Sequence, residues 1–367
     1  MERSFTEHEV ASPPGTAPHS TVMTDRAPSG SGPRGRSFVV IVNYRTAALV
    51  IESLRSLLPE LASLRGGRVV VVDNASGDDS VARIQSAINA QGWDQWAEVV
   101  PLPRNGGFAY GNNRAIDRVR QIDPEFSFIV FLNPDATVCP GALETMIGHL
   151  EAHPDAGIVG ASIEDEHGVT QRSAHLFPSP LGELDEAAEL GVLSRIIGSR
   201  AKSIAASERP CVCDWVSGAC FAIRRKVLEQ VGPLDEGFFL YFEETEFCFR
   251  ARRLRWSCWF VPDARVVHKE GSSTGVRDIT RRRPSYWFAS RRRFFVKAHG
   301  VWGLVAADLL WAMGYGTAVT RRSLGLARAH NHPPRPQRFL SDLLIGDLKA
   351  VLRGELSNLS LVAERQP

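Results

Sequence analysis

Four short apolar runs, each followed by a polar cluster, constrain the fold of this chain more than any other feature. The runs lie at 38–42, 68–72, 99–102 and 128–132. Continuous runs of this length are typical of strands that are buried on both faces of a sheet. Stretches with helical periodicity separate them, at 47–58, at 81–90 and from about Gly111 onward. The resulting order β-α-β-α-β-α-β predicts an α/β fold with a mostly parallel sheet and right-handed crossovers.

The regular alternation ends after residue 132. The later patterns predict helices at 142–152, 225–231 and 243–254, and strands at 158–163, 220–223 and 256–261. Residues 164–213 are expected to form an irregular insertion with a short helix. Residues 1–36 are rich in Pro, Gly, Ser and Thr, which predicts a disordered tail. We therefore divide the chain into a tail (1–36), a main domain (37–274) and a basic, aromatic, helical extension (275–367).

Charge and cysteine usage exclude several classes of protein. The formal net charge of this 367-residue chain is only +2, which does not argue for a nucleic acid partner. The six cysteines include no CxxC pair, and this indicates reduced thiols rather than a zinc site. The first apolar run is too short for a signal peptide and begins too far into the chain. We expect a cytoplasmic protein.

Each of the four apolar runs ends in polar residues. These clusters are Asn43-Tyr44, Asp73-Asn74-Ala75-Ser76, the loop from Asn105 through Gly107 to Asn113, and Asn133-Pro134-Asp135. Any one of them alone would be interpreted as a turn. Ligands of open parallel sheets bind at the carboxyl ends of the strands, where these clusters would meet. Four clusters on one edge predict a crevice for a base, a ribose and a diphosphate.

Carboxylates and one histidine supply the candidate chemistry. Asp73 could accept the N–H of a uracil or thymine ring, and Asp135 is a hard ligand suited to Mg²⁺ or Mn²⁺. His268 either is structural or completes the metal shell together with Asp135 and the diphosphate. Glu243 and Glu244 open a predicted helix, where they either stabilise its N-terminus or include a general base.

At this point the sequence resembles the family 2 glycosyltransferases with the GT-A fold, and within them the bacterial rhamnosyltransferase-like branch. The resemblance covers about 230 residues and rests on the order and spacing of several motifs. These are 40–44, 72–76, 105–113, 132–136, Trp215-Val216-Ser217-Gly218, 239–250 and His268. It implies a Rossmann-like nucleotide-binding half with a mixed sheet, followed by the helical extension.

The resemblance also implies roles for individual residues. A donor site would include Asn43, Tyr44, Asp73, Asn105, Gly107, Asn113, Asn133 and Asp135. Asn133-Pro134-Asp135 stands where the family has a D-x-D motif, and this leaves Asp135 as the main metal ligand beside His268. Trp215 and Gly218 would lie on the acceptor side. Glu244 replaces the aspartate of the family's Glu-Asp-x-Asp motif as the catalytic base, with Glu243 as the second candidate.

The implied reaction is a single, inverting displacement. A sugar, with rhamnose preferred, would move from UDP or dTDP to a hydroxyl of a glycan or lipid-linked acceptor with the help of Mg²⁺ or Mn²⁺. A nucleotidyltransferase is the first alternative, although Asn43-Tyr44-Arg45-Thr46 lacks the glycines that such an enzyme needs after its first strand. The second alternative is a catalytically inactive binding protein of the same fold, supported only by the glutamate at position 244.

The extension suggests a membrane partner. Residues 286–297 interleave aromatics with arginines, and eight Arg or Lys residues occur between 277 and 297. The apolar segment 301–319 could span a membrane, lie in its interface, or pack on the core or on a second copy of the chain in a homodimer. We expect peripheral contact with the inner face of the plasma membrane.

Overall fold

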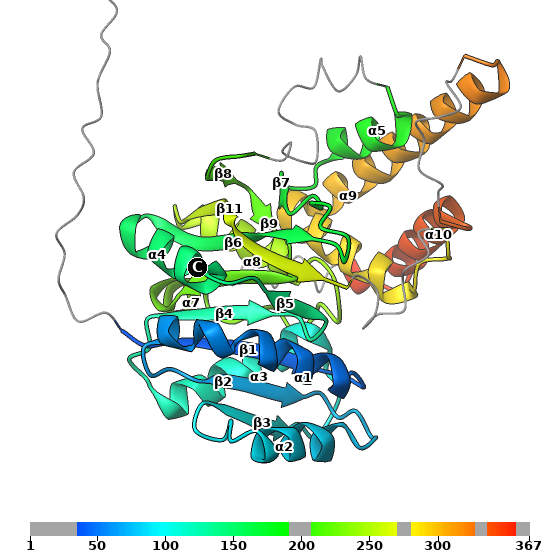
Figure 1. The fold of residues 1–367 in the computed structure, drawn as a ribbon. Coiled ribbons are helices and arrows are strands. Elements are labelled where there is room, and N and C mark those ends of the chain that lie inside the picture. The colour runs from blue at the N-terminus through cyan, green and yellow to red at the C-terminus, as the bar shows by residue number, and fades with distance from the viewer. Residues whose placement is uncertain (1–34, 191–206, 270–279, 327–335, 357–367) are drawn as a thin grey trace, which may run out of the picture. The chain divides into compact units, whose positions relative to one another are not determined.

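A mixed nine-stranded sheet organises the chain in the computed structural model, which describes residues 35–190, 207–269, 280–326 and 336–356 (Figure 1). One half of the sheet consists of β1 (Ser37–Asn43), β2 (Val69–Asp73), β3 (Ala97–Pro101) and β4 (Phe128–Leu132). These strands are mutually parallel and lie in the order β3-β2-β1-β4. The predicted parallel α/β half is therefore confirmed.

Helices cover both faces of this half-sheet. The connecting helices are α1 (Ala47–Ser56), α2 (Ser80–Ala90) and α3 (Gly107–Ile122), and a 3-10 helix (Leu58–Leu64) follows α1. Alternate residues of β1 enter two separate cores, with Val39 and Ile41 in one and Phe38 and Val40 in the other. Burial on both faces is the physical reason for the unbroken apolar run.

The other half of the sheet is mixed. It comprises β5 (Ala136–Val138), β6 (Ala156–Glu164), β8 (Cys211–Cys213), β10 (Cys220–Arg224) and β11 (Ser257–His268). β10 runs antiparallel between β4 and β6, and β11 pairs parallel with β6 and antiparallel with β5 and β8. β11 is longer than the predicted 256–261. A register shift between Val261 and Arg265 accommodates Pro262 and lets the strand continue to His268.

The predicted irregular insertion contains regular pieces. A two-residue strand, β7 (Ala174–His175), pairs with β9 (Trp215–Val216), and the expected short helix is α5 (Pro180–Ala188). Ser179 caps α5 by accepting a hydrogen bond from Gly182 N at 3.1 Å. The remaining helices of the main domain are α4 (Ala142–Ala152), α7 (Arg225–Val231) and α8 (Glu243–Arg253).

The extension consists of α9 (Ser285–Ser323) and α10 (Phe339–Leu352). Gly300, with φ of 72°, kinks α9. Among the described helices α9 is the one that is long and apolar enough to cross a membrane, yet 39% of its most apolar window is buried inside the protein. The predicted tail, apart from residues 35 and 36, lies outside the described residues, and so does the predicted boundary at 274.

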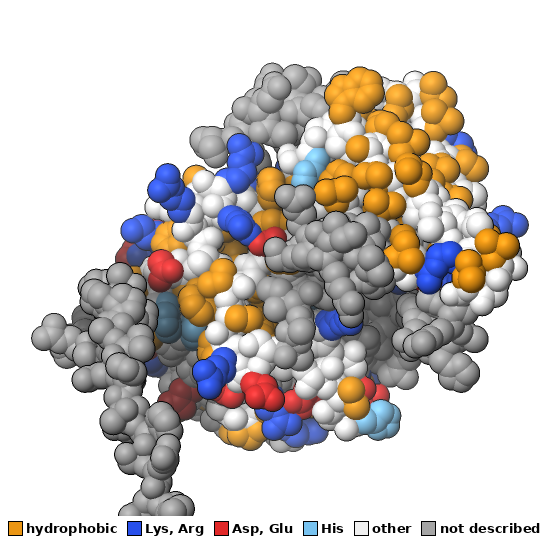
Figure 2. Space-filling view, turned by 90° about the horizontal axis from the view of Figure 1, so that it is seen from above, with side chains coloured by type: hydrophobic (Ala, Val, Ile, Leu, Met, Phe, Trp, Pro, Cys, Tyr) orange, Lys and Arg blue, Asp and Glu red, His pale blue; other side chains and the backbone are white. Residues whose placement is uncertain are grey.

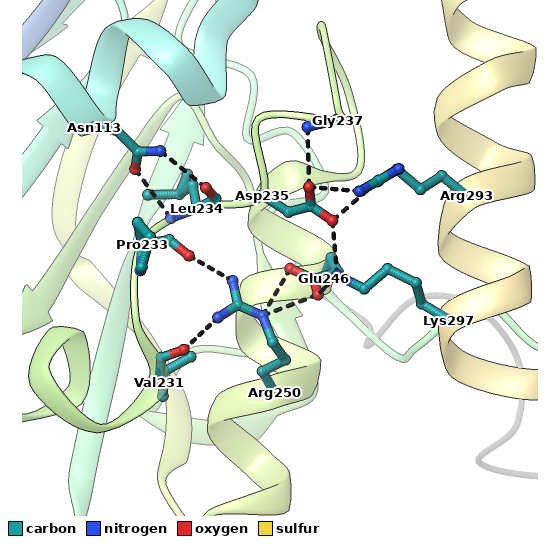
Figure 3. A network of polar contacts seen from close by, with 10 residues as sticks. All are labelled: Asn113, Val231, Pro233, Leu234, Asp235, Gly237, Glu246, Arg250, Arg293 and Lys297. Atoms are coloured by element: carbon teal, nitrogen blue, oxygen red, sulfur yellow. Dashed lines mark hydrogen bonds and ion pairs between the residues drawn. The ribbon is translucent and has the colours of Figure 1, made fainter. Parts of the chain in front are cut away.

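Within the basic run of the extension, Arg291, Arg293 and Lys297 form internal ion pairs, whereas Arg281 and Arg282 are exposed as the sequence suggests. Arg291 is only 1% exposed and pairs with Glu183 of α5 at 3.0 Å and with Asp308 at 2.8 Å. Arg293 pairs with Asp235 at 2.8 Å, and Lys297 contacts both Asp235 and Glu246 (Figure 3). Asp308 belongs to α9 itself, but Glu183 belongs to α5, Asp235 to the segment before α8 and Glu246 to α8, so these pairs hold α9 against the main domain.

Candidate active site

A hydrogen-bonded cluster fixes Asp73 where β1 and β2 end. Asn43 Nδ2 donates to Asp73 Oδ2 at 2.7 Å, and the Ser76 hydroxyl donates to the same oxygen at 2.5 Å. Ser76 N donates to Asp73 Oδ1 at 3.0 Å. A carboxylate has about four acceptor positions, so the described residues occupy three and leave one for a ligand. Asn43 therefore orients Asp73, and the Asp73 carboxylate can accept one further hydrogen bond from a ligand.

Two turns are locked together beside Asp73. Arg45 N donates to the Ser76 hydroxyl at 2.8 Å, and Arg45 Nε donates to the Ser76 carbonyl at 2.9 Å. Ala75 adopts φ of 53° to make the second turn. Tyr44 is 38% exposed at the rim of this cluster, where its ring is available to stack on a ligand.

The glycine loop is held by Asn74. Its side-chain amide donates to Asn105 Oδ1 and to the Gly107 carbonyl, both at 3.0 Å. A Cβ on Gly107, whose φ is 88°, would lie 2.1 Å from the carbonyl oxygen of Phe239. The sequence suggests that these glycines admit a diphosphate, but the close approach seen at Gly107 is to the backbone of Phe239.

Asn113 makes contacts of a different kind. Its Nδ2 donates to the Leu234 carbonyl at 2.9 Å, and its Oδ1 accepts from Leu234 N at 3.0 Å (Figure 3). Nδ2 also contacts Glu236 Oε1 at 3.0 Å. These bonds use the amide to anchor the loop after α7. Direct contact between Asn113 and a donor stays a prediction.

Asp135 and His268 come together although 133 residues separate them in the sequence. His268 Nε2 lies 3.1 Å from Asp135 Oδ1 and 3.4 Å from Asn133 Nδ2. Lys269 N also donates to the Asp135 carbonyl at 3.0 Å. The length of β11 creates this arrangement, since its last residue, His268, pairs with Ala136, the first residue of β5, directly after Asp135.

This pair suits a divalent cation only with help from the donor. Among the described residues, no group of three or more His, Cys, Asp or Glu side chains is placed to hold a metal ion. Mg²⁺ is usually held by one or two carboxylates, with phosphate oxygens completing its shell. Asp135 and His268 would supply the protein share of such a site.

Two buried acids open α8. The preceding residues, Tyr241 and Phe242, have φ of 72° and 69°, a conformation that is uncommon for residues other than glycine. Glu243 is buried and Glu244 is half-buried, and the Oε2 atom of each has no hydrogen-bond partner among the described residues. Burial raises the pKa of Glu244 to about 7. Burial and the neighbouring charge of Glu244 raise the pKa of Glu243 well above its usual range.

Gly218 faces Glu244. A Cβ on Gly218 would lie 3.3 Å from Glu244 Oε1, and a hydrogen bond from the Gly218 backbone partly offsets the raised pKa. Trp215 lies in the adjoining β9, stacked on His175 at 4.2 Å with its Nε1 donating to Leu176 O at 3.0 Å. Gly218 thus joins the site directly, whereas the contacts of Trp215 hold the β7–β9 ribbon.

Glu246 has a separate environment. It is 1% exposed, and its carboxylate pairs with Arg250 Nε at 2.9 Å and with Lys297 of α9 (Figure 3). Both partners of this carboxylate are cations of the protein, so Glu246 serves as an ion-pair partner that joins α8 to α9. Of the three acids that open α8, only Glu243 and Glu244 have the surroundings of a base.

The sequence reasoning missed contributors to the site. Ser76 was visible in the cluster that starts at Asp73, but its two bonds to that carboxylate were not anticipated. Phe239 accepts a hydrogen bond from Phe108 N at 2.7 Å, and its ring lies 5.6 Å from that of Tyr286. No sequence signal joins these three positions, which lie far apart in the chain.

Comparison with known proteins places this geometry in a family. Residues 38–232 match the sequence profile of glycosyl transferase family 2. The chain is 27% identical over 298 residues to N-acetylglucosaminyl-diphospho-decaprenol L-rhamnosyltransferase of Mycobacterium tuberculosis, a match covering 75% of this chain and 88% of that protein. It is 26% identical over 174 residues to rhamnosyltransferase WbbL of Escherichia coli, covering 44% of this chain and 60% of that protein.

A solved structure supports the fold. The mannosyltransferase PcManGT from Pyrobaculum calidifontis, solved in complex with GDP-Man and Mn²⁺, aligns with a TM-score of 0.50 and 16% identity. The alignment covers 93% of this chain and 87% of that one. The predicted GT-A fold is confirmed, and the profile match extends over more than half of the chain. The chain therefore belongs to glycosyl transferase family 2, as a rhamnosyltransferase-like member with the GT-A fold.

Proposed function

We propose that this protein is an inverting glycosyltransferase that moves rhamnose from a dTDP- or UDP-linked donor to a hydroxyl of a lipid-linked or glycan acceptor. The observation that carries the proposal is the carboxylate of Glu244, which has one oxygen without a described partner, a pKa of about 7 and an adjoining glycine backbone. The names of the two relatives support rhamnose, and that of the mycobacterial relative supports a lipid-linked acceptor.

We assign recognition of the nucleobase, uracil or thymine, to Asp73. Asn43 and Ser76 hold its carboxylate and leave one acceptor position, which suits the ring N–H of uracil or thymine. The exposed ring of Tyr44 can stack on the base. A purine does not present the same edge to this carboxylate.

Asp135 and His268 are assigned to Mg²⁺ or Mn²⁺. Their side chains lie 3.1 Å apart and offer one carboxylate and one imidazole. When bound, the cation would neutralise the charge that develops on the leaving diphosphate. One carboxylate and one imidazole can bind either of these two cations.

The protein's own chemistry is then a proton transfer. Glu244, once ionised, takes the proton of the acceptor hydroxyl as its oxygen attacks the anomeric carbon on the face opposite the diphosphate. The C–O bond to the diphosphate breaks as the new bond forms, which inverts the configuration. Glu243 is deeper and harder to ionise, so we assign it to support rather than to base chemistry.

We also place the protein at the inner face of the plasma membrane as a peripheral protein. Apolar side chains gather on the surface formed by α9 (Figure 2), where Trp302, Leu309 and Met313 are 83%, 59% and 63% exposed. Exposed apolar side chains next to Arg321 and Arg322 suit the interface of an anionic leaflet. The buried opposite face of α9, with Arg291 paired to Asp308, argues against a full span.

A thermal-shift series tests the proposal. The protein is heated with dTDP, UDP or GDP, with and without Mn²⁺, because a ligand that binds only the folded state must raise the unfolding midpoint. We expect dTDP or UDP with Mn²⁺ to give the largest shift, and dTDP-rhamnose to be consumed when a lipid-linked acceptor is added. A larger shift with GDP would overturn the donor assignment. The family match already favours this reaction over nucleotidyl transfer.

A further inference from the structure

A basic groove lies between the start of α9 and α10, outside the donor site. Its volume is about 1060 Å³, which is large enough for a small-molecule ligand. Its cationic lining residues are Arg282, Arg283, Arg292, Arg338, Lys349 and Arg353. Among the described lining residues, two are acids, Asp342 and Glu355. The groove therefore carries a marked excess of positive charge although the whole chain is nearly neutral.

Some of these cations form ion pairs that hold helices together, and others can interact with a ligand. Arg282 pairs with Asp342 and Arg292 pairs with Asp347, both at 2.7 Å, and these pairs fasten α10 to α9. Lys349 in the last turn of α10 and Arg353, the C-cap residue that follows the helix, are both exposed. Arg353 forms an ion pair with Glu355 at 3.7 Å, and both side chains are more than half exposed, so solvent screens this pair. A polyanion is the ligand that best matches such a set.

The groove also has an apolar side. Ile345 lines it and is 51% exposed. Leu348 and Leu352 continue the exposed apolar surface along α10. Charged donors next to exposed aliphatic side chains suit an amphiphile, with an anionic head in the groove and an apolar chain along the helix.

One wall of the groove touches the segment that leads to the acid pair. Tyr286 lines the groove, and its ring lies 5.6 Å from Phe239 and 6.2 Å from Tyr241. The Ser290 hydroxyl donates to Leu240 O at 3.0 Å. Residues 239–242 directly precede Glu243, the first residue of α8, and Phe239 also accepts a hydrogen bond from Phe108 N. They therefore connect this wall of the groove to the acid pair and to the glycine loop.

We propose that this groove binds the diphosphate of a prenyl-diphosphate-linked acceptor, with the prenyl chain on the apolar surface of α10 and the acceptor sugar directed toward Glu244. The inference rests on the proposed function and adds to it the acceptor class and its binding site. The groove provides cations for the diphosphate, and Ile345, Leu348 and Leu352 provide the surface for the chain.

Binding is tested first without turnover. The full chain is titrated with farnesyl diphosphate in EDTA and saturating dTDP, so that neither the metal site nor the donor site can take up the probe. We expect the dissociation constant to rise about tenfold or more in the Lys349→Ala/Arg353→Ala double variant. Ile345→Ser should weaken farnesyl diphosphate but leave inorganic diphosphate unaffected. Lys226→Ala, which removes an exposed charge of α7 outside the groove, is the matched control. It should change the affinity neither for farnesyl diphosphate nor for inorganic diphosphate.

Two results would overturn the inference. One is equal affinity for farnesyl diphosphate in the wild type and in a double variant whose circular dichroism and unfolding midpoint match the wild type. If the double variant misfolds, the single Lys349→Ala variant serves instead. The other is full displacement of the probe by phosphatidylglycerol vesicles, which would make the groove a general site for anionic lipids.

A second measurement separates this inference from the proposed function. With a prenyl-diphosphate-linked sugar as acceptor, the double variant should show an acceptor KM raised about tenfold and an unchanged donor KM. If the double variant transfers sugar with an unchanged acceptor KM, the groove is not the acceptor site, but the proposed glycosyltransferase function stands. If the wild type binds farnesyl diphosphate in the groove but transfers no sugar, the proposed function is wrong, but the groove is still a binding site for prenyl diphosphates.

Discussion

Replacing Glu244 by glutamine tests the centre of the mechanism. Gln keeps the size of the side chain but cannot accept the acceptor proton. Loss of a general base typically slows turnover by about 10²–10⁴-fold, so we expect a decrease within that range. Donor binding should persist, because Asp73, Asp135 and His268 lie on other elements.

The pH dependence follows from the same carboxyl group. Burial raises the pKa of Glu244 from 4.5 to about 7. The base must be ionised, so its active fraction is about a tenth at pH 6 and about nine tenths at pH 8. Wild-type kcat should therefore rise through neutral pH, and the residual activity of Glu244→Gln should lack that rise.

The raised pKa also has a consequence for stability. A carboxyl whose pKa rises on folding binds its proton more tightly in the folded protein. Its stabilising contribution is present below the unfolded pKa of 4.5 and is lost as the pH rises through about 7. The shift corresponds to about 3 kcal/mol for the ionised form. Glu244→Gln should raise the unfolding midpoint at pH 8 and leave it nearly unchanged at pH 4, below the unfolded pKa.

The assay compares Glu244→Gln with Glu243→Gln as its matched control. Release of dTDP from dTDP-rhamnose is followed at saturating acceptor between pH 5.5 and 8.5, and dTDP binding is measured separately. An inactive Glu243→Gln beside a Glu244→Gln that retains near-normal turnover would refute the assignment. So would a Glu244→Gln variant that is no more stable than the wild type at pH 8.

Three further predictions concern the donor, the metal and the membrane. Asp135→Asn should reduce turnover by about two orders of magnitude or more, and full activity of the wild type in EDTA would remove the metal from the mechanism. Asp73→Asn should weaken dTDP binding by about tenfold or more, because a charged acceptor becomes neutral, and calorimetry will show this. The protein should sediment with anionic vesicles in low salt and be released in high salt. Trp302→Glu with Met313→Glu should abolish that sedimentation, whereas a wild type that stays in solution at low salt would contradict the membrane assignment.

The nucleotide-binding half could be predicted because its signals are local. A strand buried on both faces must be apolar throughout, as β1 is, and the polar residues that follow it mark the ligand edge. Asn43 and Asp73 meet there because parallel neighbouring strands end at the same level. The fold class, the parallel pairing of the first four strands and the meeting of Asn43 with Asp73 follow from this rule.

The remaining features depend on contacts that no periodicity reveals. The meeting of Asp135 with His268 requires β11 to pass through a register shift at Pro262, where the sequence suggests that a strand ends. The arginines of α9 look like a surface in the sequence, yet Arg291 and Arg293 have carboxylate partners 108 and 58 residues away. A charge run predicts a solvated face only when no distant acid meets it.

The same ion pairs join the extension to α8 and to the segment that precedes it. Burial alone would raise the pKa of Asp235, but Arg293 and Lys297 lower it to about 2, so that carboxylate stays ionised at neutral pH. Lys297 also contacts Glu246, which lies two residues after Glu244. Removing α9 would take both cations from Asp235 and one of the two from Glu246, and uncompensated buried charge of this kind costs several kcal/mol. The profile match ends at residue 232, before Glu244, His268 and α9. In the proposed mechanism Asp73 and Asp135 of the donor site lie within that match, whereas Glu244 and the extension that contacts its helix lie beyond it.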